Sequence, residues 1–314
     1  MKTCIQFARC LAVALAACAG SEARGEYLLG LTSANHLLTF SGDGPGSVVA
    51  DVPVTNLAAG ETLLGIDRRP ATAQIYALGS TNTIYVVDRF TGVATAVTGG
   101  PAFALSGNSF GFDFNPAADR IRVVSDAGQN LRLNPIGGAG GLAAADATLA
   151  FAAGDVNAAR TPHVVELAYT NSKPVLGPTT LYGIDSARGV LVRIGADPAN
   201  AVVGDPGNPN SGVVTTIGAL GVATTDVVGF DVSGLTGIAY ASLTPAAGGP
   251  SRLYTINLNT GAATLVGTIG SGFTITGLTA AVPEPGGVVL LGMGLVGLVA
   301  VRGHSRRAGS AGRA

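Results

Sequence analysis

The sequence predicts an all-β fold, a β-propeller of about five four-stranded blades, and three observations support this class. The stretch from Asp226 to Ile269 contains four short apolar runs separated by turn residues. Related runs recur along the chain at intervals of roughly 40 to 60 residues, a spacing close to that of propeller blades. The body of the chain contains no amphipathic helical period of any length.

One run illustrates the strand pattern. Tyr254, Ile256 and Leu258 fall on one face of a strand, and the residues between them fall on the other. Gly261 comes after this run and can take the positive φ that a short hairpin turn needs. The stretch therefore predicts one antiparallel blade.

The other copies stand in chain order. The first has strands at 27–32 and 36–40, and the second has strands at 63–67, 74–77, 84–88 and 91–97. The third has strands at 110–114, 120–124 and 131–133, and the fourth at 164–169, 181–185 and 190–194. After the fifth copy one strand remains, 275–281, while the first copy is short of strands. Pairing the two would close the ring and remove exposed sheet edges.

Residues 1–24 resemble a secretory signal peptide. Lys2 and Arg9 form its positive start, residues 11–19 its short apolar core, and Ala17-Cys18-Ala19 a small-residue cleavage site. All three cysteines lie in this segment, so the processed chain would have no disulfide. A second interpretation stays open: Leu15-Ala16-Ala17-Cys18 resembles a bacterial lipobox, in which Cys18 would be acylated and become the new N-terminus. Either way the folded domain is predicted to span 25–281.

The C-terminal end has three parts. Val282, Pro283, Glu284 and Pro285 precede an apolar run, 286–301, which ends in an arginine-rich tail. As a helix this run would rise roughly 24 Å, slightly under the hydrocarbon thickness of about 30 Å. The arginines would hold its end in the cytoplasm. Its many glycines make it a poor permanent helix and favour a processing signal over a plain C-terminal anchor.

These parts, over 282–314, resemble the PEP-CTERM sorting signal of exported proteins in many Gram-negative bacteria. The resemblance implies transient anchoring in the inner membrane through 286–301 and cleavage by exosortase near Val282–Pro285. Delivery to the cell surface or to an exopolysaccharide matrix, as in a biofilm, would be the next step.

The body also resembles a known family. Residues 110–125, FGFDFNPAADRIRVVS, and 129–135, QNLRLNP, are similar to the signature of domain-of-unknown-function family 4394. The resemblance extends over about 27–279. It implies a propeller-like, secreted bacterial protein and brings no assigned activity with it.

The charge of the body excludes one class of partner. From Gly25 to Pro285 there are eleven basic and eighteen acidic residues, a net charge of −7. A nucleic-acid-binding domain needs a basic face, so no nucleic-acid partner is expected.

A Gly-[Ile/Phe]-Asp signature recurs and marks four acids: Asp67, Asp113, Asp185 and Asp231. One carboxylate per blade, converging at the ring axis, could bind calcium through oxygen ligands. The alternative is structural, since an Asp at a strand end accepts hydrogen bonds from the amides of the turn after it. No other cofactor is expected.

Arg120, Arg122 and Arg132, with Asp119 and Asp126, form the densest charged cluster. Planar guanidinium groups suit the carboxylates of an acidic polysaccharide. A solvated strand face with internal ion pairs would explain the same cluster without a ligand.

Catalytic chemistry finds little support. The three histidines, His36, His163 and His304, have no zinc-site spacing, and no phosphate-binding loop is present. We therefore assign no catalytic residue and expect an exported, non-catalytic binding or scaffold module for exopolysaccharide or protein. The alternative is a secreted glycan-acting hydrolase or lyase. Several carboxylates within about 10 Å in an open central pocket would favour that alternative.

Overall fold

The computed structural model describes residues 25–173, 177–196 and 208–281. The chain divides into two compact units, Met1–Ala281 and Val282–Ala314, and all of the described residues belong to the first unit. The predicted signal peptide, including Cys18, the Val282–Pro285 motif and the anchor at 286–301 lie outside the described residues. Within the described part of the chain, no helix has the length and apolar character needed to cross a membrane.

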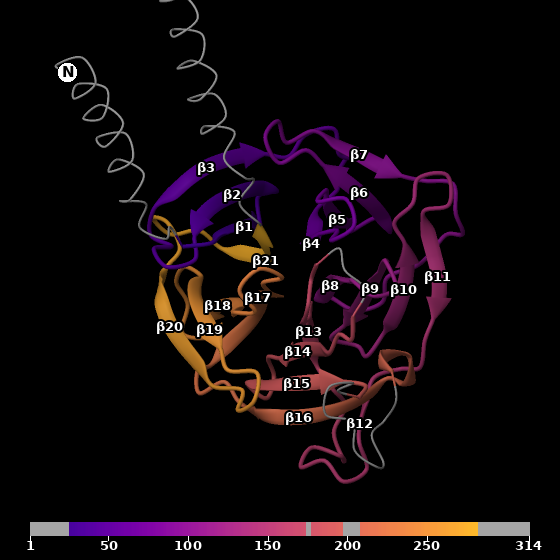
Figure 1. Ribbon diagram of the computed structural model, residues 1–314, viewed down its shortest axis with the longest axis vertical. Helices are drawn as coiled ribbons and strands as arrows, with labels where there is room; N and C mark the ends of the chain where they lie inside the picture. The colour runs from indigo at the N-terminus through magenta and orange to yellow at the C-terminus, as the bar shows by residue number, and fades with distance from the viewer. Residues whose placement is uncertain (1–24, 174–176, 197–207, 282–314) are drawn as a thin grey trace, which may run out of the picture. The chain divides into compact units, whose positions relative to one another are not determined.

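Five sheets stand as blades around a central axis, which confirms the predicted propeller (Figure 1). Blade 1 contains β21 (Ile275–Ala281), β1 (Tyr27–Thr32), β2 (His36–Ser41) and β3 (Val48–Pro53). Blade 2 contains β4 (Leu63–Arg68), β5 (Ile75–Gly79), β6 (Thr83–Val87) and β7 (Ala94–Val97). Blade 3 contains β8 (Phe110–Asn115), β9 (Arg120–Ser125), β10 (Asn130–Asn134) and β11 (Gly141–Ala145).

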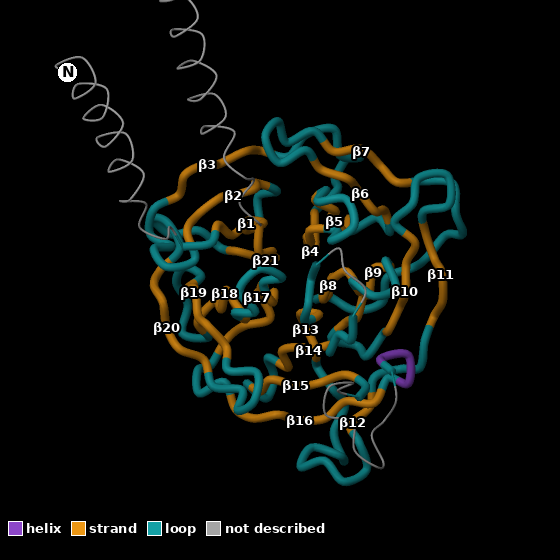
Figure 2. The backbone as a smooth tube through the Cα atoms, in the orientation of Figure 1, coloured by secondary structure: helices purple, strands orange, loops and turns teal. Residues whose placement is uncertain are grey.

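Blade 4 contains β13 (Val164–Tyr169), β14 (Leu181–Asp185), β15 (Val190–Ile194) and β16 (Val213–Ala219). A short strand, β12 (Ala150–Phe151), pairs in parallel with β16 at its outer edge. Blade 5 contains β17 (Thr224–Val232), β18 (Ala239–Pro245), β19 (Arg252–Ile256) and β20 (Ala263–Thr268). Among the described residues the single helical piece is the 3₁₀ turn η1 (Pro209–Ser211), and strands and loops make up the rest (Figure 2).

The two ends of the domain close the ring, as the sequence predicts. β21 pairs antiparallel with β1, and the register sets Leu28 opposite Ala280 and Gly30 opposite Leu278. The first blade therefore takes its innermost strand from the end of the domain. This pairing leaves no blade incomplete and joins segments about 250 residues apart in sequence.

The core lies between the blades. Each neighbouring pair of blades shares one cluster of buried apolar side chains, which gives five clusters around the ring. Within β1, Leu29 and Leu31 pack with Ile66 of blade 2, while Leu28 packs with Tyr240 of blade 5. Successive side chains of a strand point to opposite faces of its blade, and both faces pack against neighbouring blades. The strand is therefore apolar at almost every position.

At four positions the innermost strands of neighbouring blades lie so close together that only a residue without a side chain fits. Gly65, Gly111, Gly229 and Gly277 occupy these strands at four of the five positions around the axis. A Cβ atom at Gly229 would lie 2.8 Å from the backbone nitrogen of Leu278 in the next blade. One at Gly111 would lie 2.8 Å from the carbonyl carbon of Glu166. Glycine at these positions therefore sets the small radius of the ring.

We expect Gly229→Ala to destabilise the protein by about 2 kcal/mol, because an added methyl group would meet backbone atoms that cannot move aside. Gly154→Ala is the matched control, since nothing lies within 4 Å of the Cβ it would gain. Denaturant unfolding followed by circular dichroism measures both. Equal stability of the two variants would show that the inner strands have room to separate.

Candidate functional site

Three acids from three different blades meet at the axis. Asp67 on β4, Asp113 on β8 and Asp231 on β17 each offer a carboxylate oxygen, and these oxygens all lie within 4.8 Å of one another. The three residues are only 2%, 2% and 4% exposed, respectively. We call them the axial carboxylate cluster.

The local backbone explains why these acids face one another. Each stands two residues after a glycine on an innermost strand, so it lies on the same face as the glycine, toward the next blade. Asp67 Oδ2 accepts a hydrogen bond from the Phe114 amide at 2.8 Å, and Asp231 Oδ2 accepts one from the Ala280 amide at 2.6 Å. The Thr279 hydroxyl lies 2.8 Å from Asp67 Oδ1 and 3.1 Å from Asp231 Oδ2. The cluster therefore links neighbouring blades.

The fourth predicted acid, Asp185, does not join this cluster. It lies on β14, the second strand of blade 4, where its Oδ2 atom is 2.8 Å from Arg188 Nη1. Its Oδ1 atom accepts a hydrogen bond from the Arg188 amide at 3.1 Å in the next turn. Asp185 is thus an acid that caps a turn, the structural alternative that the sequence left open.

Blade 4 contributes Glu166 at the axis instead. This residue lies on β13, the innermost strand of its blade, and is 1% exposed. The sequence pattern does not mark it, because it lacks the glycine signature. The order of the runs within each copy could have identified it. Asp67, Asp113 and Asp231 stand in the first run of their copies, as Glu166 does, whereas Asp185 stands in the second run.

Burial dominates the electrostatics of these four acids, and no arginine or lysine is among the main influences on their pKa values. Desolvation, and next the charges of nearby acids, raise the pKa values of Asp67, Asp113 and Glu166 well above their usual range. Desolvation raises the pKa of Asp231 to about 6, and the charge of Glu26 acts in the same direction.

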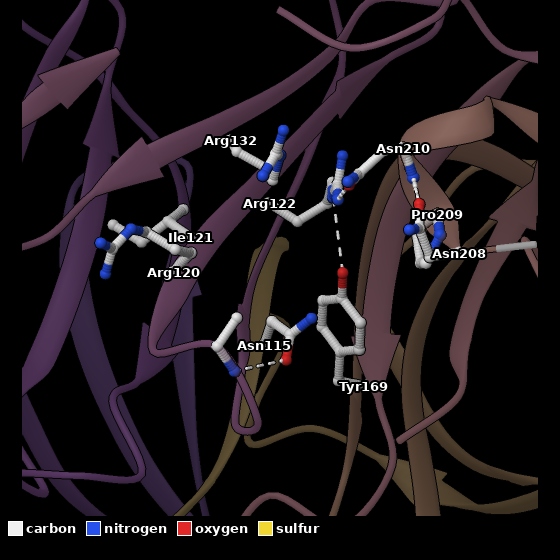
Figure 3. A pocket seen from close by; sticks show the side chains of 10 residues that line it. Asn115, Arg120, Ile121, Arg122, Arg132, Tyr169, Asn208, Pro209 and Asn210 are labelled. Atoms are coloured by element: carbon white, nitrogen blue, oxygen red, sulfur yellow. Dashed lines mark hydrogen bonds between the residues drawn. The ribbon is translucent and has the colours of Figure 1, made fainter. Parts of the chain in front are cut away.

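A second feature is a pocket of about 190 Å³ between blades 3 and 4, which we call the inter-blade basic pocket (Figure 3). All three predicted arginines line it. Its walls are Asn115, Ala118, Arg120, Ile121, Arg122, Arg132, Tyr169, Asn208, Pro209 and Asn210. The structure therefore brings together the arginine cluster that the sequence singled out, and adds a wall from blade 4.

Two of these arginines share the carboxylate of Asp146. Arg122 Nη1 lies 2.7 Å from Asp146 Oδ2, and Arg132 holds the same group through Nε at 2.7 Å and Nη2 at 2.9 Å. Burial acts to raise the pKa of Asp146, but hydrogen bonds from the two arginines outweigh it and lower that pKa. Arg122 also reaches Asn210 Oδ1 at 2.6 Å and the Tyr169 hydroxyl at 3.4 Å (Figure 3).

The third arginine, Arg120, donates from Nη1 to its neighbouring backbone carbonyl of Asp119 at 2.9 Å. Neither acid predicted beside the arginines lines the pocket: the Asp119 carboxylate pairs with Arg69, and Asp126 accepts a hydrogen bond from the Asn108 amide at 2.9 Å. The pocket wall thus combines the ion-pair network of Arg122, Arg132 and Asp146 with Arg120, and no acid is among the lining residues.

The fold and these two sites define a closed, five-bladed β-propeller with buried acids at its axis and a basic pocket between two blades. The family model described as "Domain of unknown function (DUF4394)" matches residues 36–279, so the chain belongs to this family. No curated protein matches the chain.

Among solved structures, the chain is similar to a protein of Bacteroides uniformis provisionally named a 6-phosphogluconolactonase. The identity is 13%, the match covers 78% of this chain and 83% of that one, and the TM-score is 0.36.

We expect the melting temperature of the chelator-treated protein to fall as the pH rises from about 5 to about 8. The axial acids have folded pKa values above their unfolded values of about 4, so the folded state holds protons that the unfolded chain releases. Their stabilising contribution is complete below the unfolded pKa and is lost as the pH passes through the folded pKa, near 6 for Asp231. Each pKa unit corresponds to about 1.4 kcal/mol.

Thermal unfolding at a series of pH values measures this slope. In Asp67→Asn/Asp113→Asn the slope should be shallower, because an amide carries no charge at any of these pH values. A melting temperature of the unsubstituted protein that stays constant or rises over this interval would contradict the expectation.

Proposed function

We propose that this protein is an exported, non-catalytic binding module that holds acidic exopolysaccharide through the inter-blade basic pocket. The observation that carries the proposal is the convergence of Arg120, Arg122 and Arg132 on one pocket. A guanidinium group can hold a carboxylate through two parallel hydrogen bonds, which favours uronic acids over neutral sugars.

The overall charge of the body restricts how such a ligand would bind. With a net charge of −7 from Gly25 to Pro285, the protein as a whole repels a polyanion. Acids farther away than about 8 to 10 Å are largely screened at physiological salt, whereas Arg120 and Arg132 would touch the ligand. Arg122 is 2% exposed and would act through its charge. Binding would therefore depend on direct contact in the pocket and not on a long-range field.

The size and lining of the pocket suit a small group. About 190 Å³ lies below the roughly 300 to 1,000 Å³ of most ligand pockets, so it would admit one carboxylated sugar residue at a chain end or branch. The amides of Asn115, Asn208 and Asn210 line the same space and carry NH2 groups that can donate to sugar hydroxyls, while their oxygens accept hydrogen bonds within the protein.

The burial of the axial carboxylate cluster favours binding over glycan cleavage. Two-carboxylate glycosidases need both acids in contact with the sugar. Asp67, Asp113 and Asp231 lie close enough together, but they are 2% to 4% exposed and face one another across the axis.

We expect Arg120→Ala to weaken binding to a polyuronate by about 10- to 100-fold, since one charge-assisted hydrogen bond contributes roughly 1.5 to 3 kcal/mol. This variant leaves the ion pairs to Asp146 in place. Arg252→Ala is the matched control, because it removes an exposed arginine from β19 of blade 5. Calorimetry against polygalacturonate, with neutral dextran as reference, measures the affinities. Equal binding by the two variants, or equal affinity for dextran, would refute the proposal.

Export and surface retention form the second part of the proposal, and the sequence supports them. We expect that replacing Pro283, Glu284 and Pro285 by alanine blocks exosortase cleavage, because the extended prolyl segment is what the enzyme cleft would accept. In a Gram-negative host that carries an exosortase, the variant would stay in the inner-membrane fraction, while the Ser310→Ala control would reach the surface.

Fractionation and the mass of the surface protein measure both steps of this processing. A Cys18→Ser variant separates the two N-terminal interpretations, since only a lipoprotein would lose its acyl chains. Surface delivery of the alanine variant at the control level would overturn the sorting assignment.

A further inference from the structure

The axial carboxylate cluster holds more acceptor oxygens than the protein provides donors for. Hydrogen bonds from Phe114, Arg68 and the Thr279 hydroxyl reach Asp67, and the Ala280 and Val232 amides reach Asp231. These bonds use part of the capacity of two carboxylates. On the other two acids only backbone amides act: the Tyr169 amide on Asp113, and the Phe112 and Phe230 amides on Glu166.

Oδ1 of Asp113 is buried and has no hydrogen-bond partner. The Phe112 and Phe230 amides act on the buried Glu166 carboxylate and lower its pKa, but neither of its oxygens has a partner at full hydrogen-bond geometry. Asp113 and Glu166 are 2% and 1% exposed, so bulk water does not reach them. A buried acceptor without a donor costs free energy, and an uncompensated buried carboxylate costs considerably more. Such oxygens require a proton or a cation.

Glu166 belongs to the same group of charges. Its strand, β13, lies between β8 and β17 in the ring, which carry Asp113 and Asp231. The charges of Asp67 and Asp231 act on Glu166, and the charge of Glu166 acts on Asp113. Four blades therefore contribute one acid each, and blade 1 contributes the Thr279 hydroxyl.

We propose that Asp67, Asp113 and Asp231 bind one calcium ion at the ring axis, and that the negative charge of Glu166 adds to its attraction. The donor set is oxygen only, which suits a hard cation. Ligands at 2.3 to 2.6 Å from calcium stand up to about 5 Å apart, which matches oxygens within 4.8 Å of one another. Magnesium, at 2.0 to 2.1 Å, would need a tighter set and usually keeps several waters.

A cation at this place would join the blades. Its ligands come from β4, β8 and β17, which are innermost strands of blades 2, 3 and 5. Because it would bind the folded ring and not the unfolded chain, it would stabilise the propeller by a free energy that grows with the logarithm of its concentration over its dissociation constant.

The test uses the purified full-length chain, treated with a chelator and then melted at pH 7.5 with calcium, magnesium, zinc or no metal. We expect calcium at about 100 times its dissociation constant to raise the melting temperature by about 5 °C or more. We also expect calorimetry to give one site per chain. An effect of magnesium or zinc that exceeds the effect of calcium would overturn the assignment.

Two variants separate a metal site from a purely structural cluster. Asp67→Asn/Asp113→Asn should lose the calcium-dependent shift, because two of the three proposed ligands lose their charge. Asp185→Asn is the matched control: it removes another buried acid, which should lower the melting temperature but leave the calcium shift unchanged.

If the axial variant fails to fold, the calcium response of the unsubstituted chain still decides the matter. A melting temperature that depends on pH but not on calcium would mean that protons alone neutralise the cluster, and the proposal would be wrong.

Discussion

The close approach of the five innermost strands is the constraint on which the rest of this structure depends. Each of them is the edge of its own sheet, so part of its backbone has no partner strand. Carboxylates from neighbouring blades supply acceptors, as Asp67 does for the Phe114 amide and Asp231 for the Ala280 amide. Buried acids at the axis are therefore a consequence of a small closed ring, and the oxygens that hydrogen bonds leave free create the need for a cation or protons.

Local patterns predicted most of the fold, because strands and turns depend on alternation and glycine placement. Even the closure of the ring by 275–281 could be expected, since this strand belonged to no copy and the first copy was short of strands. The acids were predicted less well. Gly183, before Asp185, carries the same signature, yet a Cβ there would meet the Val164 side chain of its own blade. The same Gly-[Ile/Phe]-Asp pattern thus predicts that the glycine backbone lies close to another segment, but it does not predict whether that segment belongs to the same blade or to the next one.

The basic pocket also shows how far the sequence alone can predict a site. Arg120 and Arg122 are two residues apart on one strand, so the sequence alone placed them on one face. The facing wall comes from blade 4, where Asn210 meets Arg122 across 88 residues of sequence. No local pattern encodes that contact, because it depends on how two blades pack. The arginines could be predicted from the sequence, whereas the pocket could not.

One row of side chains across blade 3 connects the two sites. Asp113 stands opposite Arg122 in the register of β8 and β9, and Arg122 stands opposite Arg132 in that of β9 and β10, so all three lie on one face. Adjacent strands are about 5 Å apart, and salt screens little within a buried interface. A cation on Asp113 would cancel a negative charge that lies one strand away from Arg122, and would raise the positive potential of the pocket. Calcium at the axis and a carboxylate in the pocket would therefore strengthen each other's binding through electrostatics, without any change of shape.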